Sequence, residues 1–180
     1  MKVFIAGARA VSALNESVKA RLNNIFSKNY TVIIGDANGV DSAVQKYFSH
    51  LNYQNVIVYA SEGKPRNNIG NWEVRKVEVP IRAKGFSYYA AKDKAMADDA
   101  DYGFMIWNGE SKGTLTNIVN LLKLDKKSLV YLTTNNSFHN IDSMDELQEL
   151  LETCGQTAKA LFEKVYKASM VSVYRQATLF

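Results

Sequence analysis

The sequence predicts an α/β protein: a Rossmann-like, mostly parallel sheet flanked by helices on both faces, with a C-terminal helical extension. Short apolar runs at residues 3–6, 31–34, 55–59, 102–107 and 128–133 are typical of strands buried on both faces. Apolar residues recur at helical spacing in most of the intervening segments. Because strands that alternate with helices are joined by crossover connections, we expect parallel pairing.

The expected helices begin at polar residues that can cap a first turn. Ser12 or Asn15 is expected to cap the first helix, Ser87 the third, and Ser143 the fifth, where Glu146 completes a capping box. These helices and the three others are expected to end near residues 28, 49, 99, 124, 153 and 171. Residues 60–85 and 134–141 are expected to be loops, and residues 171–180 an apolar, β-prone tail.

The composition is that of an ordinary globular chain and leaves the partner open. The 180 residues are 47% hydrophobic and 22% charged, with a formal net charge of +4. Such mild basicity suits an anionic small molecule as well as a nucleic acid. The single Cys154 excludes an intrachain disulfide and a cysteine-cluster zinc site, and His50 and His139 lack ligand spacing. We therefore expect neither a metal nor a cofactor.

No apolar run approaches the ~18 residues of a membrane span, so no membrane contact is expected. The first residues enter a strand without the long apolar stretch of a signal peptide. A cytoplasmic protein is the resulting expectation.

The stretch 31–41, TVIIGDANGVD, carries the strongest functional signal. A β-branched strand breaks into Gly35-Asp36-Ala37-Asn38-Gly39 and then opens a helix. Because the first N–H groups of a helix have no partner within it, such a turn offers an anion site at the edge of the sheet. Asp41, in the first turn of that helix, either holds a ribose hydroxyl or stabilises the turn.

Two further segments point to the same edge. Gly7 and Arg9 follow the first strand, and Arg9 either clamps a phosphate or carboxylate or is a solvated surface residue. After strand 102–107, the turn from Asn108 to Thr114 again opens a helix. Two helix N-termini that meet at one edge would hold a phosphate better than either alone.

The stretch 60–85 is rich in charge and holds Lys64, Arg66 and Arg75 among its basic residues. These residues would meet an anionic ligand or form a solvated face. Trp72 and the Tyr88-Tyr89 pair either stack on a base or pack in the core.

Three features, in this order, resemble the SLOG superfamily, which includes the LOG nucleotide N-glycosidases, the YspA-related proteins and the DprA core. They are the Gly7-Ala8-Arg9 turn, the Gly35–Asp41 turn, and Met96 with Ala100-Asp101 ahead of the glycine-threonine loop at 109–114. The resemblance covers residues 2–133. It implies a nucleotide-binding domain over residues 1–135, with residues 136–180 as a helical extension packed on that domain or on a dimer partner.

The resemblance implies binding of a nucleotide or nucleotide-derived ligand, as in a sensor, by a homodimer. The position of the LOG catalytic glutamate is Asn117, and an amide cannot serve as that carboxylate. The first alternative, a nucleoside-monophosphate N-glycosidase, would need another carboxylate such as Glu110, Asp36 or Asp93, so whether the protein is an enzyme stays open. The second is single-stranded DNA binding of DprA type, which is less expected because the basic residues are scattered.

The predicted ligand-binding residues come from the two turns, the end of the first strand and the third helix. They are Gly7, Arg9, Gly35, Asp36, Asn38, Gly39, Asp41, Lys92, Gly109, Gly113 and Thr114.

Overall fold

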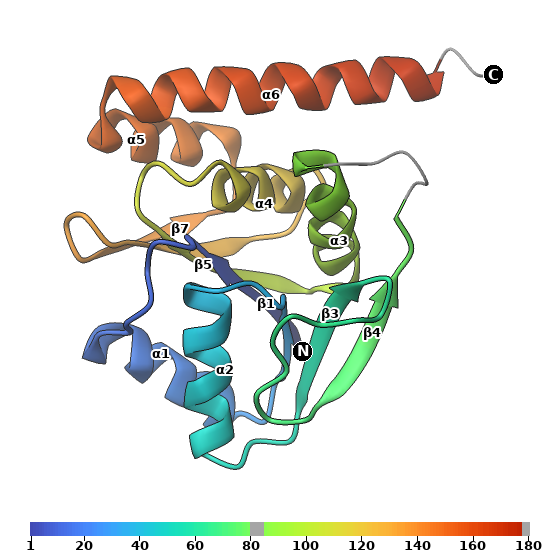
Figure 1. Ribbon diagram of the computed structural model, residues 1–180. Coiled ribbons are helices and arrows are strands. Elements are labelled where there is room, and N and C mark those ends of the chain that lie inside the picture. The colour runs from blue at the N-terminus through green and yellow to red at the C-terminus, as the bar shows by residue number, and fades with distance from the viewer. Residues whose placement is uncertain (80–84, 178–180) are drawn as a thin grey trace.

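The computed structural model describes residues 1–79 and 85–177 and confirms the predicted fold class (Figure 1). The strands are β1 (Lys2–Gly7), β2 (Thr31–Ile34), β3 (Val56–Ser61), β4 (Glu73–Val77), β5 (Tyr102–Trp107), β6 (Ser128–Leu132) and β7 (Ser137–Ile141). They form one sheet in the order β4-β3-β2-β1-β5-β6-β7. Neighbouring strands are parallel except for β7, which runs antiparallel to β6.

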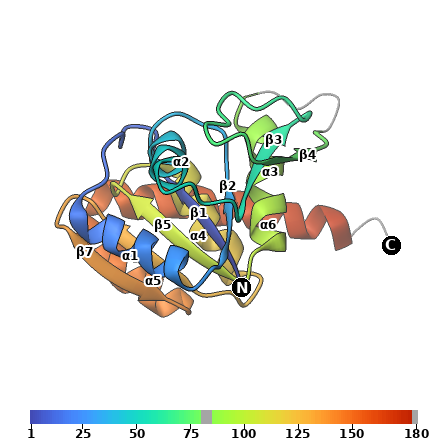
Figure 2. The same ribbon diagram turned by 90° about the horizontal axis from the view of Figure 1, so that it is seen from below.

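Helices cover both faces of this sheet (Figures 1 and 2). They are α1 (Glu16–Ser27), α2 (Val40–His50), α3 (Phe86–Asp99), α4 (Lys112–Leu122), α5 (Met144–Cys154) and α6 (Gln156–Ala177). Successive residues of β1 show the two cores: Val3 and Ile5 pack with α1 and α2, whereas Phe4 and Ala6 pack with α3 and α4. In Figure 1, α5 and α6 form a further layer above α4.

The sheet has a switch point between β1 and β5. From β1 the chain builds β2, β3 and β4 on one side and then returns to place β5 on the other side of β1. The carboxyl ends of the two strands are level, because Gly7 of β1 is in register with Ile106 of β5. In open α/β sheets, ligands bind in the crevice outside such a point.

The structure differs from the sequence prediction mainly at the edges of the sheet. β4 and β7 lie within segments predicted as loops, because strands EVRKV and SFHNI lack the continuous apolar run of a central strand. The proposed boundary at residue 135 falls between the paired strands β6 and β7. The tail predicted as β-prone is helical as far as Ala177, and residues 178–180 lie outside the described residues.

The first residues of several helices also differ from those predicted from the sequence. Asn15, and not Ser12, caps α1 by accepting a hydrogen bond from the Val18 N–H. Gly85 precedes α3 in place of Ser87, and α4 begins at Lys112, before Thr114. The predicted capping box of Ser143 and Glu146 is present in α5. Among the described residues, no helix has the length and apolarity to cross a membrane.

Candidate functional site

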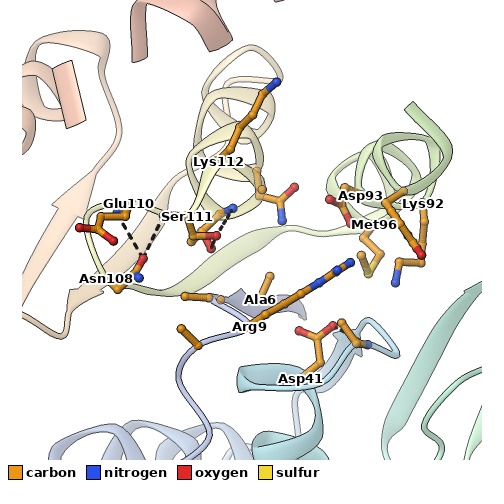
Figure 3. A pocket seen from close by; sticks show the side chains of 18 of the residues that line it. Ala6, Arg9, Asp41, Lys92, Asp93, Met96, Asn108, Glu110, Ser111 and Lys112 are labelled. Atoms are coloured by element: carbon orange, nitrogen blue, oxygen red, sulfur yellow. Dashed lines mark hydrogen bonds between the residues drawn. The ribbon is translucent and has the colours of Figure 1, made fainter. Parts of the chain in front are cut away.

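A cavity of about 600 Å³ opens at the switch point (Figure 3). Its walls come from the end of β1 and the loop after it, the start of α2, one side of α3, and the β5–α4 turn. The volume lies within the range of small-molecule sites. Of the predicted ligand-binding residues, those that line it are Gly7, Arg9, Asp41, Lys92, Gly113 and Thr114.

The other predicted residues are not among the described residues that line the cavity. Gly35 lies against Asp41 and Lys92, since an added Cβ would be 2.5 Å from the Asp41 carboxylate. Asn38 is exposed, and its Oδ1 accepts a hydrogen bond from Asn67 at 3.1 Å. Gly109 is buried beside Cys154 of α5.

The N-terminus of α2 is covered by the chain that follows β1. The N–H of Val40 donates to the Ala8 carbonyl at 3.4 Å. Gly39 has φ +81°, and a Cβ at this position would lie 2.4 Å from the Arg9 carbonyl oxygen. Glycine is therefore required here for close packing of two backbone segments. The N–H of Val40 at the start of α2 is therefore bonded to the chain after β1 and is not open to a ligand.

Asp36 is held by two cations and is not free for acid–base chemistry. Its carboxylate accepts hydrogen bonds from Nη2 and Nε of Arg66, at 2.7 and 3.2 Å, and from Nζ of Lys92 at 2.5 Å. The Asp36 and Lys92 side chains are 5% and 4% exposed. Burial alone would raise the pKa of Asp36, but the Arg66 hydrogen bonds and the Lys92 charge lower it well below its usual range. Asp36 thus positions Arg66 and Lys92 at the cavity wall.

Side chains of α2 and of the 67–69 loop bond two carbonyl groups of the first turn. Asn67 Nδ2 donates to the Asp36 carbonyl at 2.8 Å, and Gln45 Nε2 donates to the Gly35 carbonyl at 2.8 Å. Gln45 Oε1 in turn accepts a hydrogen bond from the Ile69 N–H. These contacts could not be predicted from the sequence, because they join residues that lie 10, 31 and 24 positions apart.

Asp41 stabilises its own turn. Its Oδ2 accepts a hydrogen bond from the Ala37 N–H at 3.1 Å. Burial raises the pKa of Asp41 to about 6, although the nearby Lys92 charge acts in the opposite direction. Of the two roles open for this residue from the sequence, the hydrogen bond supports bracing of the turn.

The N-terminus of α4, in contrast, faces the cavity. The N-cap Ser111 accepts hydrogen bonds at its Oγ from the Thr114 N–H at 3.4 Å and from the Thr114 hydroxyl at 3.0 Å. Asn108 Oδ1 accepts from the N–H groups of Glu110 and Ser111, which fixes the turn. A Cβ added at Gly113 would have no described atom within 4 Å. The first turn of α4 therefore borders open space.

Arg9 brings positive charge into the same cavity. Figure 3 shows its side chain extending from the end of β1 toward α3. Its guanidinium lies 5.0 Å from the Tyr89 ring centroid, and that of Arg66 lies 4.9 Å from it. Arg9 makes no ion pair or hydrogen bond with another described residue.

Trp72, for which stacking on a base or packing in the core was open from the sequence, is a core residue. Its Nε1 donates to the buried Tyr53 carbonyl at 2.7 Å.

Two carboxyl groups lie at opposite ends of the cavity (Figure 3). Glu110 is exposed at the β5–α4 turn, whereas Asp93 projects from α3. Asp93 makes no hydrogen bond or ion pair with another described residue. Burial raises the pKa of Asp93 to about 7, against the opposing charges of Lys92 and Arg9.

Asn117 also lines the cavity, from the second turn of α4. It is 4% exposed, and its Oδ1 has no hydrogen-bond partner among the described residues. An unpaired buried oxygen is uncommon in proteins and calls for a partner. No cluster of possible metal ligands is found in the described part of the chain.

Comparison with known proteins supports the fold and nothing finer. No family model matches the chain, and no curated protein matches it. A solved structure of DNA processing protein A (DprA) from Helicobacter pylori is similar, with a TM-score of 0.57 and 16% sequence identity. The match covers 93% of this chain and 81% of that one. At this identity the likeness shows a DprA-like, Rossmann-type fold.

Proposed function

We propose that the cavity at the switch point binds a phosphorylated nucleoside. One observation carries the proposal: the open N-terminus of α4 lines the same cavity as the Arg9 guanidinium, which has no ion pair with a described residue. A helix N-terminus and an arginine are two of the groups that proteins use most to bind phosphate. Lys92 contributes less, because its charge is neutralised by Asp36.

In this proposal the phosphate lies over the first turn of α4, at Gly113 and the Thr114 hydroxyl. The positive charge of Arg9, which also lines the cavity, offsets the negative charge of the phosphate. The cavity volume leaves room for a sugar and a base.

A thermal-shift and calorimetry panel tests the proposal. The compounds are nucleoside 5′-monophosphates, ribose 5-phosphate and unphosphorylated nucleosides. We expect the phosphorylated compounds to raise Tm and the nucleosides to have little effect, because binding to the folded state stabilises it by mass action. A panel in which no phosphorylated compound raises Tm contradicts the proposal.

Arg9→Ala sharpens this test, and the chain offers a matched control. Arg21 is likewise exposed, and its guanidinium lies 4.9 Å from the ring of Phe138, remote from the cavity. We expect Arg9→Ala to weaken nucleotide binding about tenfold or more and Arg21→Ala to leave it unchanged. Equal effects of the two substitutions on nucleotide binding would contradict a role of Arg9 in binding the phosphate.

Single-stranded DNA is the second candidate ligand, favoured by the likeness to DprA, whose structure is described in terms of single-stranded DNA binding. Fluorescence anisotropy with a labelled oligothymidylate at two salt concentrations tests it. If this candidate is correct, affinity falls steeply with salt. Oligonucleotide binding without any mononucleotide binding would replace the first proposal by the second.

A further inference from the structure

We propose that Asp93 and Asn117 form a subsite for ribose hydroxyls, so that the cavity prefers ribonucleotides to 2′-deoxyribonucleotides. This inference rests on the proposed function, because it assumes a phosphorylated nucleoside in the cavity. It concerns two side chains that the phosphate site does not use.

Asn117 supplies the first argument. The residue is only 4% exposed and it lines the cavity. Its Oδ1 has no hydrogen-bond partner among the described residues. A carbonyl oxygen is purely an acceptor, so the ligand group that would satisfy it is a donor. A phosphate at neutral pH offers mainly acceptors, whereas a sugar hydroxyl can donate.

Asp93 supplies the second argument, by contrast with the other acids near the cavity. Asp36 is paired with Arg66 and Lys92, and Asp41 accepts a hydrogen bond from Ala37. Asp93 lines the cavity without a hydrogen bond or ion pair to any described residue. A carboxyl oxygen accepts hydrogen bonds from hydroxyls, and an ionised carboxylate also repels phosphate. Asp93 therefore favours the sugar over the phosphate as its neighbour.

The position of Asn117 along α4 agrees with a phosphate at the first turn of this helix and a sugar next to it. Asn117 lies three residues beyond Thr114, and that many residues of an α-helix advance about 4.5 Å. In a nucleoside 5′-phosphate the sugar is the group next to the phosphate. A phosphate over the first turn of α4 therefore directs the sugar toward the second turn. α3 packs against α4, and Asp93 of α3 lines the same cavity as Asn117.

Matched pairs of ribonucleoside and 2′-deoxyribonucleoside 5′-monophosphates, titrated by calorimetry, test the inference. For wild-type protein at pH 8, above the raised pKa of Asp93, we expect about tenfold tighter binding of the ribo member, the effect of one good hydrogen bond to a charged group. Asp93→Ala and Asn117→Ala should each bring this ratio at least threefold closer to one and leave the deoxy affinity nearly unchanged.

Two substitutions on the same helices serve as controls. Asp98→Ala on α3 removes an exposed carboxylate that pairs with Lys94, and Asn120→Ala on α4 removes an amide outside the set of described lining residues. Both should keep the wild-type ratio. Asp93→Asn, which preserves shape, gives a second test of Asp93 should the alanine variant fold poorly.

The outcomes separate the two proposals. Equal, measurable binding of the ribo and deoxy members overturns the hydroxyl subsite and leaves the proposed function intact. A wild-type preference that both variants retain overturns the assignment to Asp93 and Asn117. Binding of neither member overturns the proposed function, and the subsite with it.

Discussion

The β2–α2 turn and the β5–α4 turn both carry a parallel strand into the start of a helix at the same edge of the sheet, but their helix N-termini differ in access. That of α2 is packed against the chain after β1, with Val40 bonded to the Ala8 carbonyl. That of α4 borders the cavity through Gly113. The turn with the richer glycine motif is therefore the less accessible of the two.

This difference teaches that glycine content does not by itself mark a ligand site. Gly39 permits two backbone segments to touch, and Asp36 fixes the cations of the cavity wall. Gly113 instead leaves space in front of a helix N-terminus. In this account the first turn builds the wall and the second turn contacts the ligand.

The largest expected effect on the first turn comes from Asp36→Asn. It removes the carboxylate that pairs with the buried Lys92 ammonium, which should lower the free energy of unfolding by about 3–5 kcal/mol in urea titrations. The pKa of Asp36 is lowered in the folded state. The loss of unfolding free energy in Asp36→Asn is therefore complete above the unfolded-state pKa near 4, and it becomes smaller as the pH falls below that value.

Glu110→Gln is the matched control for this prediction, since Glu110 is an exposed acid in the other turn. We expect a change within about 0.5 kcal/mol. A loss of less than about 1 kcal/mol in Asp36→Asn would contradict the role given to the ion pair.

Gly39→Ala is expected to have the next largest effect. The added Cβ meets the Arg9 backbone at 2.4 Å, and the residue keeps a left-handed φ of +81°. We expect a loss of about 2–4 kcal/mol in the free energy of unfolding, measured by the same urea titration. A neutral substitution would show that the two segments are not held together as described.

Asp93→Asn tests the titration of the buried Asp93 carboxyl group in the free protein. Burial raises the pKa of Asp93 to about 7 from 3.8, with Lys92 and Arg9 opposing and Asp41 and Asp36 adding to the rise. A raised carboxyl pKa means that wild-type stability falls as pH rises from about 4 through 7.

Asparagine removes this penalty. The variant should therefore exceed wild type in Tm by about 4 °C or more at pH 8 and approach it near pH 4.5, as measured by differential scanning fluorimetry. A pH-independent difference in Tm between the two proteins would contradict this assignment.

Gly113→Ala is expected to have the smallest effect on stability and a clear effect on binding. Its Cβ enters open space, and alanine favours helix over glycine, so Tm should stay level or rise slightly. The same methyl group occupies the place proposed for phosphate, and calorimetry should show about tenfold weaker nucleotide binding. Unchanged affinity would contradict a phosphate position at the first turn of α4.

The sequence predicted the central fold because buried parallel strands are continuous apolar runs, as in 31–34 and 102–107. It missed β4 and β7 because edge strands pair on one side and carry polar residues. Homodimer formation and the role of residues 136–180 stay predictions.

For the site, the sequence located the correct edge, because the carboxyl ends of parallel strands converge there and bring Arg9 and Thr114 to one cavity. It could not tell which turn is open. That depends on contacts between distant segments, such as Asn67 with Asp36 and Gln45 with Ile69.

Titration of the ¹⁵N-labelled protein with a nucleoside 5′-monophosphate, followed by amide chemical shifts, asks whether phosphate binds at the first turn of α4 and not at that of α2. We expect the amide resonances of Gly113 and Thr114 to shift on binding and those of Asn38 and Gly39 to stay near their positions. Shifts centred on Asn38 and Gly39, or no shift at saturating nucleotide, would contradict it.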